Sequence, residues 1–216
     1  MSTFRVRYQT LEFDQVDVHL RTLRDNQQFS DDAGEAEALG ISSATWPLFG
    51  VVWASSEVLA HFMFEHDIEG LRILEVGCGI GLTSLVLGHR HANITATDQH
   101  PEAERFLTEN VSLNGLEPIP FVRTSWADDD CGLGEFDLIV GSDVLYESQH
   151  VEQLSAFIDR HAKAHCEVII VDPGRGQQSR FSTTMKTLGY AHTCSKPCTD
   201  AYLSQPFRGQ ILQYAR

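Results

Sequence analysis

Basic residues are scarce in this chain of 216 residues. Lys and Arg together number 16, against 30 Asp and Glu, which leaves a formal net charge of −14 at pH 7. Tight binding to a nucleic-acid backbone requires clustered Lys and Arg, so we expect no nucleic-acid partner. The acidity suits a basic partner or a small cationic cofactor, and it also suits nothing more than solubility.

Long apolar runs and regularly spaced cysteines are missing as well. No stretch approaches the roughly 18 apolar residues that a membrane-spanning helix needs, and residues 1–8 lack the apolar core of a secretion signal. The five cysteines show no spacing that would indicate a disulfide framework. These absences predict a cytoplasmic protein with no membrane partner, and we expect a monomer.

Residues that could bind a metal or act as a nucleophile lack the necessary partners. His161 and His165 have helical spacing without the Glu of a His-Glu-x-x-His zinc site. Cys194 and Cys198 have no second pair of ligands. Ser142 lacks the Gly-x-Ser-x-Gly setting of a hydrolase. The sequence therefore predicts neither a metal site nor a hydrolase.

Helix and strand patterns alternate regularly from residue 51 onward. Apolar periodicity predicts a helix that ends near residue 65, followed by helices at 82–89, 101–114, 151–164 and 179–188. Strands are predicted at 71–76, 94–97, 118–122, 136–140, 168–171, 190–194 and 209–214. Two prolines place the 118–122 strand at a sheet edge. Ahead of this region, residues 4–8 and 16–20 predict a hairpin.

This alternation predicts an α/β fold with a doubly wound, Rossmann-like sheet. Crossovers of this kind are right-handed, and they require a mainly parallel sheet that is covered on both faces. The seven predicted strands fit such a sheet with an antiparallel closing strand, preceded by a short N-terminal β extension.

A glycine-rich turn follows the first strand of the alternating region, in the run Glu75-Val76-Gly77-Cys78-Gly79-Ile80-Gly81. Glycines let the backbone turn tightly and approach a ligand, and the next helix offers unpaired N–H groups. Asp98 ends the second strand, where a carboxylate would accept hydrogen bonds from ribose hydroxyls. Together these features predict a nucleoside-containing cofactor at the carboxyl ends of the strands.

The details of the turn favour one cofactor. Its third glycine comes one residue earlier than in the Gly-x-Gly-x-x-Gly turn of dinucleotide sites, and Glu75 adds a negative charge. That charge would oppose a diphosphate and favour an ammonium group. S-adenosylmethionine has a ribose, an ammonium and a sulfonium but no phosphate, so the pattern favours this methyl donor over a nicotinamide cofactor.

The turn with Asp98 downstream resembles motif I and the post-I acid of the class I, seven-β-strand methyltransferases. The chain is more narrowly similar to methyltransferase family 16, the seven-β-strand protein lysine methyltransferases. Three segments resemble this family over residues 46–175: Phe49-Gly50-Val51-Val52-Trp53-Ala54-Ser55, Ser125-Trp126 and Asp143-Val144-Leu145-Tyr146. Motif I is common to the superfamily, whereas an Asp-x-x-Tyr motif with an upstream tryptophan is more specific.

The resemblance implies S-adenosylmethionine as the cofactor and a set of residues that hold it. That set is Trp53, Glu75, Gly77, Cys78, Gly79, Gly81, Asp98, Gln99, Ser125, Trp126 and Ser142. Asp143 and Tyr146 are implied as the catalytic residues that shape the acceptor channel, with Asp143 orienting the amine. Residues 46–216 would form the methyltransferase domain, and residues 1–45 the extension.

Two details of the resemblance stay open. The family usually has Pro or Asp after the upstream tryptophan, whereas Ala54 follows Trp53 here, so Trp46 is a second candidate for the pocket although Trp53 is preferred. The segment 172–175, Asp-Pro-Gly-Arg, resembles a motif of family members that methylate an electron-transfer flavoprotein subunit. A Pro-Gly turn with a surface arginine explains that segment equally well.

The predicted function is methylation of a lysine side chain of a cytoplasmic protein. The resemblance implies this acceptor, and the net charge of −14 favours the approach of a cationic segment. A small-molecule N-methyltransferase is the first alternative. A nicotinamide-dependent oxidoreductase and a non-catalytic cofactor-binding protein are alternatives of a different class.

Overall fold

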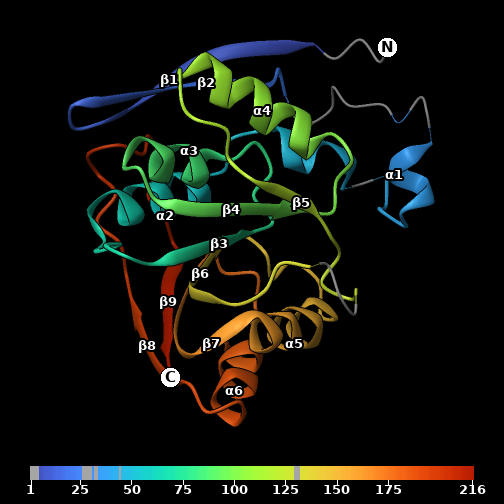
Figure 1. Ribbon diagram of the computed structural model, residues 1–216, viewed down its shortest axis with the longest axis vertical. Coiled ribbons are helices and arrows are strands. Elements are labelled where there is room, and N and C mark those ends of the chain that lie inside the picture. Colours follow the sequence, from blue (N-terminus) through green and yellow to red (C-terminus); the bar gives the residue numbers. More distant parts are fainter. Residues whose placement is uncertain (1–4, 26–30, 32–33, 44, 129–131) are drawn as a thin grey trace.

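A seven-stranded sheet lies at the centre of the molecule (Figure 1). The computed structural model describes residues 5–25, 31, 34–43, 45–128 and 132–216. The strands, in the spatial order β5-β4-β3-β6-β7-β9-β8, are β5 (Phe121–Arg123), β4 (Asn93–Asp98), β3 (Arg72–Val76), β6 (Phe136–Ser142), β7 (Ala162–Asp172), β9 (Gln210–Ala215) and β8 (Ala191–Ser195). Strand β9 runs antiparallel to both neighbours, and the other described pairings in this sheet are parallel. The predicted doubly wound sheet with an antiparallel closing strand is confirmed.

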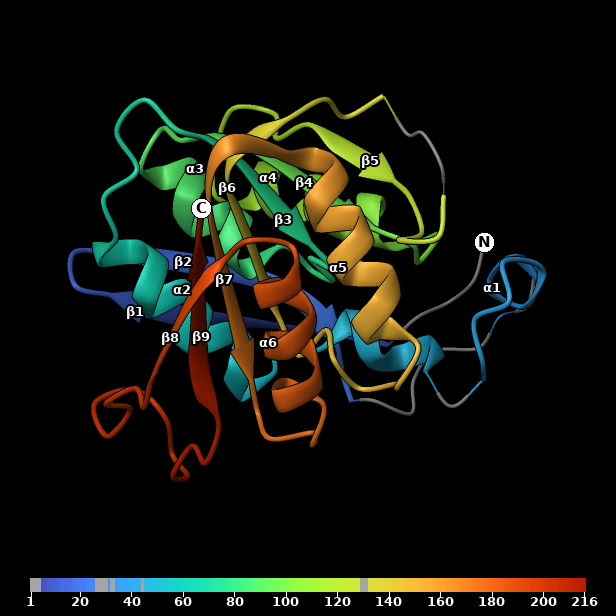
Figure 2. The same cartoon turned by 90° about the horizontal axis from the view of Figure 1, so that it is seen from below.

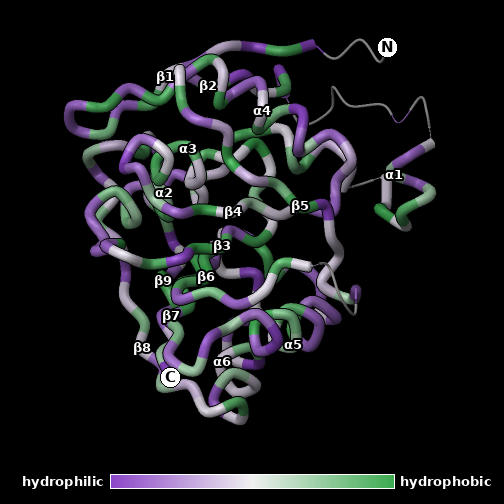
Figure 3. The backbone as a smooth tube through the Cα atoms, viewed as in Figure 1, coloured by the Kyte–Doolittle hydropathy of each residue, from purple (hydrophilic) through white to green (hydrophobic). Residues whose placement is uncertain are grey.

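Helices cover both faces of the sheet (Figures 1 and 2). One face carries α2 (Ala54–Glu65), α3 (Leu82–His89) and α4 (Ala103–Leu113), and the other carries α5 (His150–His161) and α6 (Gln178–Thr187). Alternate strand residues divide between the two layers, since Ile169 packs in the α2 cluster and Ile170 in the α5 and α6 cluster. Figure 3 shows the hydrophobic residues concentrated along the central strands, as burial on both faces requires.

The predicted N-terminal hairpin is present as β1 (Val6–Phe13) and β2 (Val16–Leu23). Phe13, Val18 and Leu20 are fully buried, and they pack in one cluster with residues of α3 and α4. Phe4, which the sequence places in the first strand, lies outside the described residues. The hairpin thus shares a core with the helices of the main sheet.

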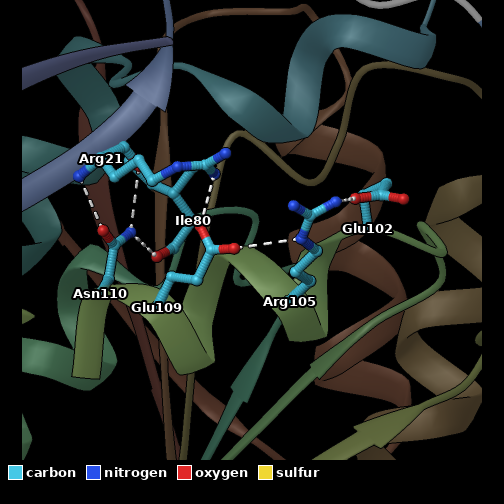
Figure 4. Close-up of polar contacts among 6 residues, drawn as sticks. All are labelled: Arg21, Ile80, Glu102, Arg105, Glu109 and Asn110. Atoms are coloured by element: carbon cyan, nitrogen blue, oxygen red, sulfur yellow. Dashed lines mark hydrogen bonds and ion pairs between the residues drawn. The ribbon is translucent and has the colours of Figure 1, made fainter. Parts of the chain in front are cut away.

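Asn110 of α4 ties the hairpin to the glycine turn (Figure 4). Its Oδ1 accepts the Arg21 N–H at 2.7 Å, and its Nδ2 donates to the carbonyls of Arg21 at 3.3 Å and Ile80 at 3.1 Å. Asn110 is fully buried, whereas the neighbouring ion pair between Arg21 and Glu109, at 2.8 Å, is partly exposed. One buried amide therefore joins three segments that are distant in the sequence.

Several sequence predictions of element bounds were wrong, and the strand predicted at 168–171 is the C-terminal part of the longer strand β7. The helix predicted at 151–164 ends at His161, because Ala162 is extended and pairs with Phe136 at the start of β7. The strand predicted at 118–122 begins only at Phe121, after its prolines, although it does lie at the sheet edge as predicted. Two short helices, α1 (Glu35–Ala38) and the 3-10 helix η1 (Trp46–Gly50), were not predicted. Within the described residues, no helix is long and apolar enough to span a membrane.

We predict that Asn110→Ala lowers the free energy of unfolding by roughly 1–3 kcal/mol, because it leaves buried backbone groups without partners. Urea denaturation measures this difference. Glu109→Gln is the matched control, since loss of its partly exposed ion pairs with Arg21 and Arg105 should change stability by less than about 1 kcal/mol. Equal effects of the two substitutions would contradict the role of Asn110.

Candidate active site

A cavity of about 370 Å³ opens at the carboxyl ends of β3, β4 and β6. The chain leaves β3 toward β4 on one side and later returns to β6 on the other, so the cavity lies where the strand order reverses. Of the residues predicted to hold a cofactor, all but Gly81 line the cavity, and so do Asp143 and Tyr146. The fold therefore brings the predicted site residues together from five segments of the chain.

The glycine turn forms the floor of this cavity. Gly77 and Gly79 have φ angles of 62° and 56°, in the region that favours glycine. A Cβ at Gly79 would lie 2.7 Å from the Phe49 carbonyl oxygen, so the close approach of the two backbones requires glycine there. Gly81 begins α3 and faces away, since its Cβ would lie 2.3 Å from Leu107 Cδ1.

Asp98 fastens the turn to β4. Its Oδ2 accepts the Gly79 N–H at 2.9 Å, and its Oδ1 accepts the His100 N–H at 2.8 Å. Burial raises the pKa of the Asp98 carboxyl, and the backbone N–H groups oppose that rise. Each carboxylate oxygen has a further lone pair, so Asp98 can accept hydrogen bonds from a ligand in the cavity as well.

Glu75 lies at the end of β3 and is almost fully buried. Its Oε2 accepts hydrogen bonds from the Ser84 N–H at 2.9 Å and the Ser84 hydroxyl at 2.5 Å. Burial raises the pKa of Glu75 to about 7, because the Ser84 bonds offset only part of the desolvation. Glu75 therefore anchors the first turn of α3 and exchanges a proton near neutral pH.

Aromatic rings form the wall beyond β5 and β6. The ring centroid of His150 lies 4.5 Å from that of Tyr146 and 5.1 Å from that of Trp126, both in edge-to-face contact. His150 is buried and burial lowers its pKa, so the imidazole is neutral at pH 7. Burial raises the pKa of Tyr146 to about 12, which keeps its phenol protonated. This wall is uncharged.

Asp143 is held in an unusual backbone conformation directly after β6. Its φ of 53° lies in the left-handed region, and its N–H donates to the Val171 carbonyl at 2.9 Å. Strained non-glycine residues of this kind cluster at functional sites. Its carboxylate is occupied by Arg175, whose Nε and Nη2 donate to Oδ1 at 2.9 Å and Oδ2 at 2.7 Å.

The segment that precedes α2 closes the remaining side of the cavity. Trp53 lines the cavity and donates its indole N–H to the Leu48 carbonyl at 2.8 Å. Trp46 does not line it, and its indole N–H is directed to the Ile41 carbonyl at 2.8 Å. Phe49, also in the wall, stacks on His100 at a centroid distance of 3.8 Å.

Sequence reasoning missed His150 and Gln153, and it left Arg175 undecided. All three line the cavity. Tyr146 precedes α5, which begins at His150, so helical spacing does not link the two residues and no local pattern signalled their contact. Arg175 follows β7, the neighbour of β6, so the parallel pairing alone would have placed it near Asp143.

Solved structures with the same fold are methyltransferases of the Rossmann-like type. The T. thermophilus 16S rRNA N2 G1207 methyltransferase (RsmC), solved in complex with AdoMet and guanosine, aligns with a TM-score of 0.67. The alignment covers 99% of this chain and 51% of that chain at 12% sequence identity. At this identity, the comparison establishes the fold alone.

The sequence comparison establishes the family. Residues 41–187 match the family described as lysine methyltransferase, and the chain belongs to that family. It is 30% identical over 140 residues to the electron transfer flavoprotein beta subunit lysine methyltransferase of Mus musculus, which covers 63% of this chain and 54% of that protein. It is 36% identical over 115 residues to the protein N-lysine methyltransferase METTL21A of Danio rerio, which covers 48% of this chain and 52% of that protein. The chain thus spans about half the length of these relatives.

We predict that the affinity for S-adenosylhomocysteine, which carries the ammonium group of the predicted cofactor, rises with pH through the pKa of Glu75, about 7. Only the ionised carboxylate attracts an ammonium, so affinity should rise roughly fivefold to tenfold between about pH 6 and 7.5. Calorimetry at the two pH values measures this change.

Glu75→Gln is the control for this titration, because glutamine keeps the size of the side chain and does not ionise. The same pH dependence in this variant would assign the titration to another group. In the unliganded protein, a rise in pH has the opposite effect on the stability of the fold. The folded-state pKa is above the ordinary value of 4.5, so the stabilisation from Glu75 is lost as pH rises from 4.5 toward 7.

Proposed function

We propose that this chain is an S-adenosylmethionine-dependent methyltransferase whose acceptor is a lysine side chain of a cytoplasmic protein. The observation that best supports it is the common cavity of Glu75, Asp98, Asp143 and Tyr146. Membership of the lysine methyltransferase family supports both the cofactor and the acceptor. Related structures with AdoMet bound agree with this cofactor.

The residues around the glycine turn fit the parts of this cofactor. Asp98 would accept hydrogen bonds from the ribose hydroxyls, and Glu75 would face the ammonium group. Trp126, with Ser125 beside it, offers an apolar edge for the adenine. The ionised carboxylate of Glu75 opposes a diphosphate, and the third glycine comes one residue earlier than in a dinucleotide turn, which together disfavour the nicotinamide alternative. When bound, S-adenosylmethionine supplies a methyl group on a sulfonium centre.

The residues beyond β6 would handle the acceptor. The uncharged rings of Tyr146 and His150 limit the access of water to the neutral amine and the sulfonium centre, and exclusion of water favours transfer of the methyl group to the amine. Asp143 would accept a hydrogen bond from the acceptor amine and so direct its lone pair. Alignment of nucleophile, methyl and leaving group is the main source of acceleration in such a transfer.

Two observations support a protein lysine as the acceptor: the net charge of the chain and the names of its relatives. A net charge of −14 favours the approach of a cationic segment and disfavours nucleic acid. The two relatives described above are named as lysine methyltransferases that act on proteins. We infer that the acceptor of this chain is also a protein lysine, and that the acceptor protein lies in the cytoplasm.

We predict that the purified enzyme labels protein in a heat-treated cytoplasmic lysate supplied with methyl-labelled S-adenosylmethionine, and that mass spectrometry locates the label on lysine. Asp143→Asn and Tyr146→Phe should lower this turnover by about a hundredfold or more, with little change in cofactor affinity. Asparagine tolerates the left-handed backbone at residue 143, so this variant should fold.

Asp137→Asn provides the matched control. Asp137 lies at the opposite end of β6, where it accepts the Arg72 N–H at 2.9 Å and pairs with Lys163 at 2.8 Å. The Asp137→Asn variant should keep full turnover. Label found on arginine, on nucleic acid or only on small amines would refute the lysine acceptor. Full turnover of the Asp143 and Tyr146 variants would remove both residues from the reaction.

A further inference from the structure

The ion pair between Arg175 and Asp143 lies in the wall of the cavity. The two residues are 32 positions apart, and the parallel pairing of β6 with β7 brings them together, with Ser142 opposite Val171. The guanidinium contacts both carboxylate oxygens, the geometry in which arginine binds a carboxylate most strongly. Only 12% of the Asp143 side chain is exposed, against 45% of Arg175. Arg175 therefore covers a largely buried carboxylate.

An isolated carboxylate at this position would hinder methyl transfer to an amine. An opposite charge within about 4–6 Å stabilises the charged form of an amine by roughly 1–3 pKa units. The ammonium form has no free lone pair and cannot attack a methyl group. A bare Asp143 would therefore bind a lysine tightly in its unreactive state.

We propose that Arg175 is a positioning residue that neutralises Asp143, so that the acceptor amine beside this carboxylate loses its proton and attacks as the free base. This inference rests on the proposed function. The guanidinium takes one lone pair of each oxygen, and the remaining lone pairs of Asp143 can still accept an N–H of the neutral amine.

The chemical step balances without another reactant. The ammonium first releases one proton to solvent. The nitrogen lone pair then forms the bond to the methyl carbon, the carbon–sulfur bond breaks with its electron pair on sulfur, and the methylated amine takes over the positive charge. The residues that act in this step are Asp143, which directs the lone pair, and Arg175, which cancels the charge of Asp143.

In the part of the chain that the structure describes, no other group around Asp143 supplies a positive charge in place of Arg175. Among the described residues that line the cavity, Arg175 is the one Arg or Lys. Asp172 interacts electrostatically with both residues of the pair, and Tyr146 interacts with Asp143. The other titratable groups nearby surround Tyr146; they are Glu147, His150 and Asp98. Asp172 is fully buried with a raised pKa, and His150 and Tyr146 are uncharged at pH 7. Asp143 itself raises the pKa of Arg175, so the guanidinium stays charged.

The test measures kcat against pH, from about 6.5 to 9.5, with saturating cofactor. The acceptor is the protein that wild type labels in the lysate, purified. Arg175→Met should raise the apparent pKa of kcat by about one pH unit, so that kcat falls about tenfold at pH 7 and recovers at high pH. Arg175→Lys keeps the charge and should restore most of the wild-type profile.

Arg180→Met is the matched control, because Arg180 pairs with Glu152 on the neighbouring surface outside the cavity. It should leave the profile unchanged. Arg175→Gln provides a second neutral variant, and cofactor affinity and melting temperature verify the fold of each protein.

Three results would overturn the proposal. The first is a loss of kcat that is equal at all pH values, which indicates a purely structural role. The second is a rise in kcat/KM with an unshifted profile, which means that Arg175 only obstructs the acceptor. The third is no change at all. Failure of the proposed function gives a different result, because wild type itself would then label no protein.

Discussion

The whole site depends on how tightly the backbone turns between β3 and α3, and Asp98 holds that turn. Its two carboxylate oxygens accept N–H groups from Gly79 and from His100, so the end of β4 and the turn after β3 are fixed relative to each other. Gly79 admits the Phe49 carbonyl where any side chain would collide, and the segment before α2 can therefore close the cavity. Asn110 supports the turn from the other side through the Ile80 carbonyl, which makes the N-terminal hairpin part of the same assembly.

Charge divides the cavity into two functional halves. Glu75 and Asp98 lie with the glycine turn, where negative charge suits a cofactor that is a cation without phosphate. Beyond β6, Tyr146 and His150 form an uncharged aromatic surface, and the nearby carboxylate of Asp143 is paired with Arg175. An amine must enter as a cation from water and react as a neutral molecule. A carboxylate that can direct the amine without holding its proton is suited to that change.

Most of the fold could be predicted from the sequence because local and global preferences agree. The helix predicted at 82–89 matches α3, since Gly81 in the left-handed conformation marks its start. The end of helix α5 at His161 could not be predicted, because the apolar pattern continues and only the pairing between Phe136 and Ala162 ends the helix. Within the site, the glycine turn and Asp98 follow a short-range pattern. The pairing of Arg175 with Asp143 depends on the neighbouring strands β6 and β7, and the contact of His150 with Trp126 joins the segments that follow β6 and β5. No local pattern encodes either contact.

The central claim is that the turn held by Asp98 binds S-adenosylmethionine. Calorimetric titration of the unliganded protein with S-adenosylmethionine, and separately with NAD, tests it most directly. The account predicts micromolar binding of S-adenosylmethionine, no heat with NAD, and affinity lower by roughly 1–3 kcal/mol in a folded Asp98→Asn variant. Binding of NAD without binding of S-adenosylmethionine would contradict the account, as would an unchanged dissociation constant in the variant.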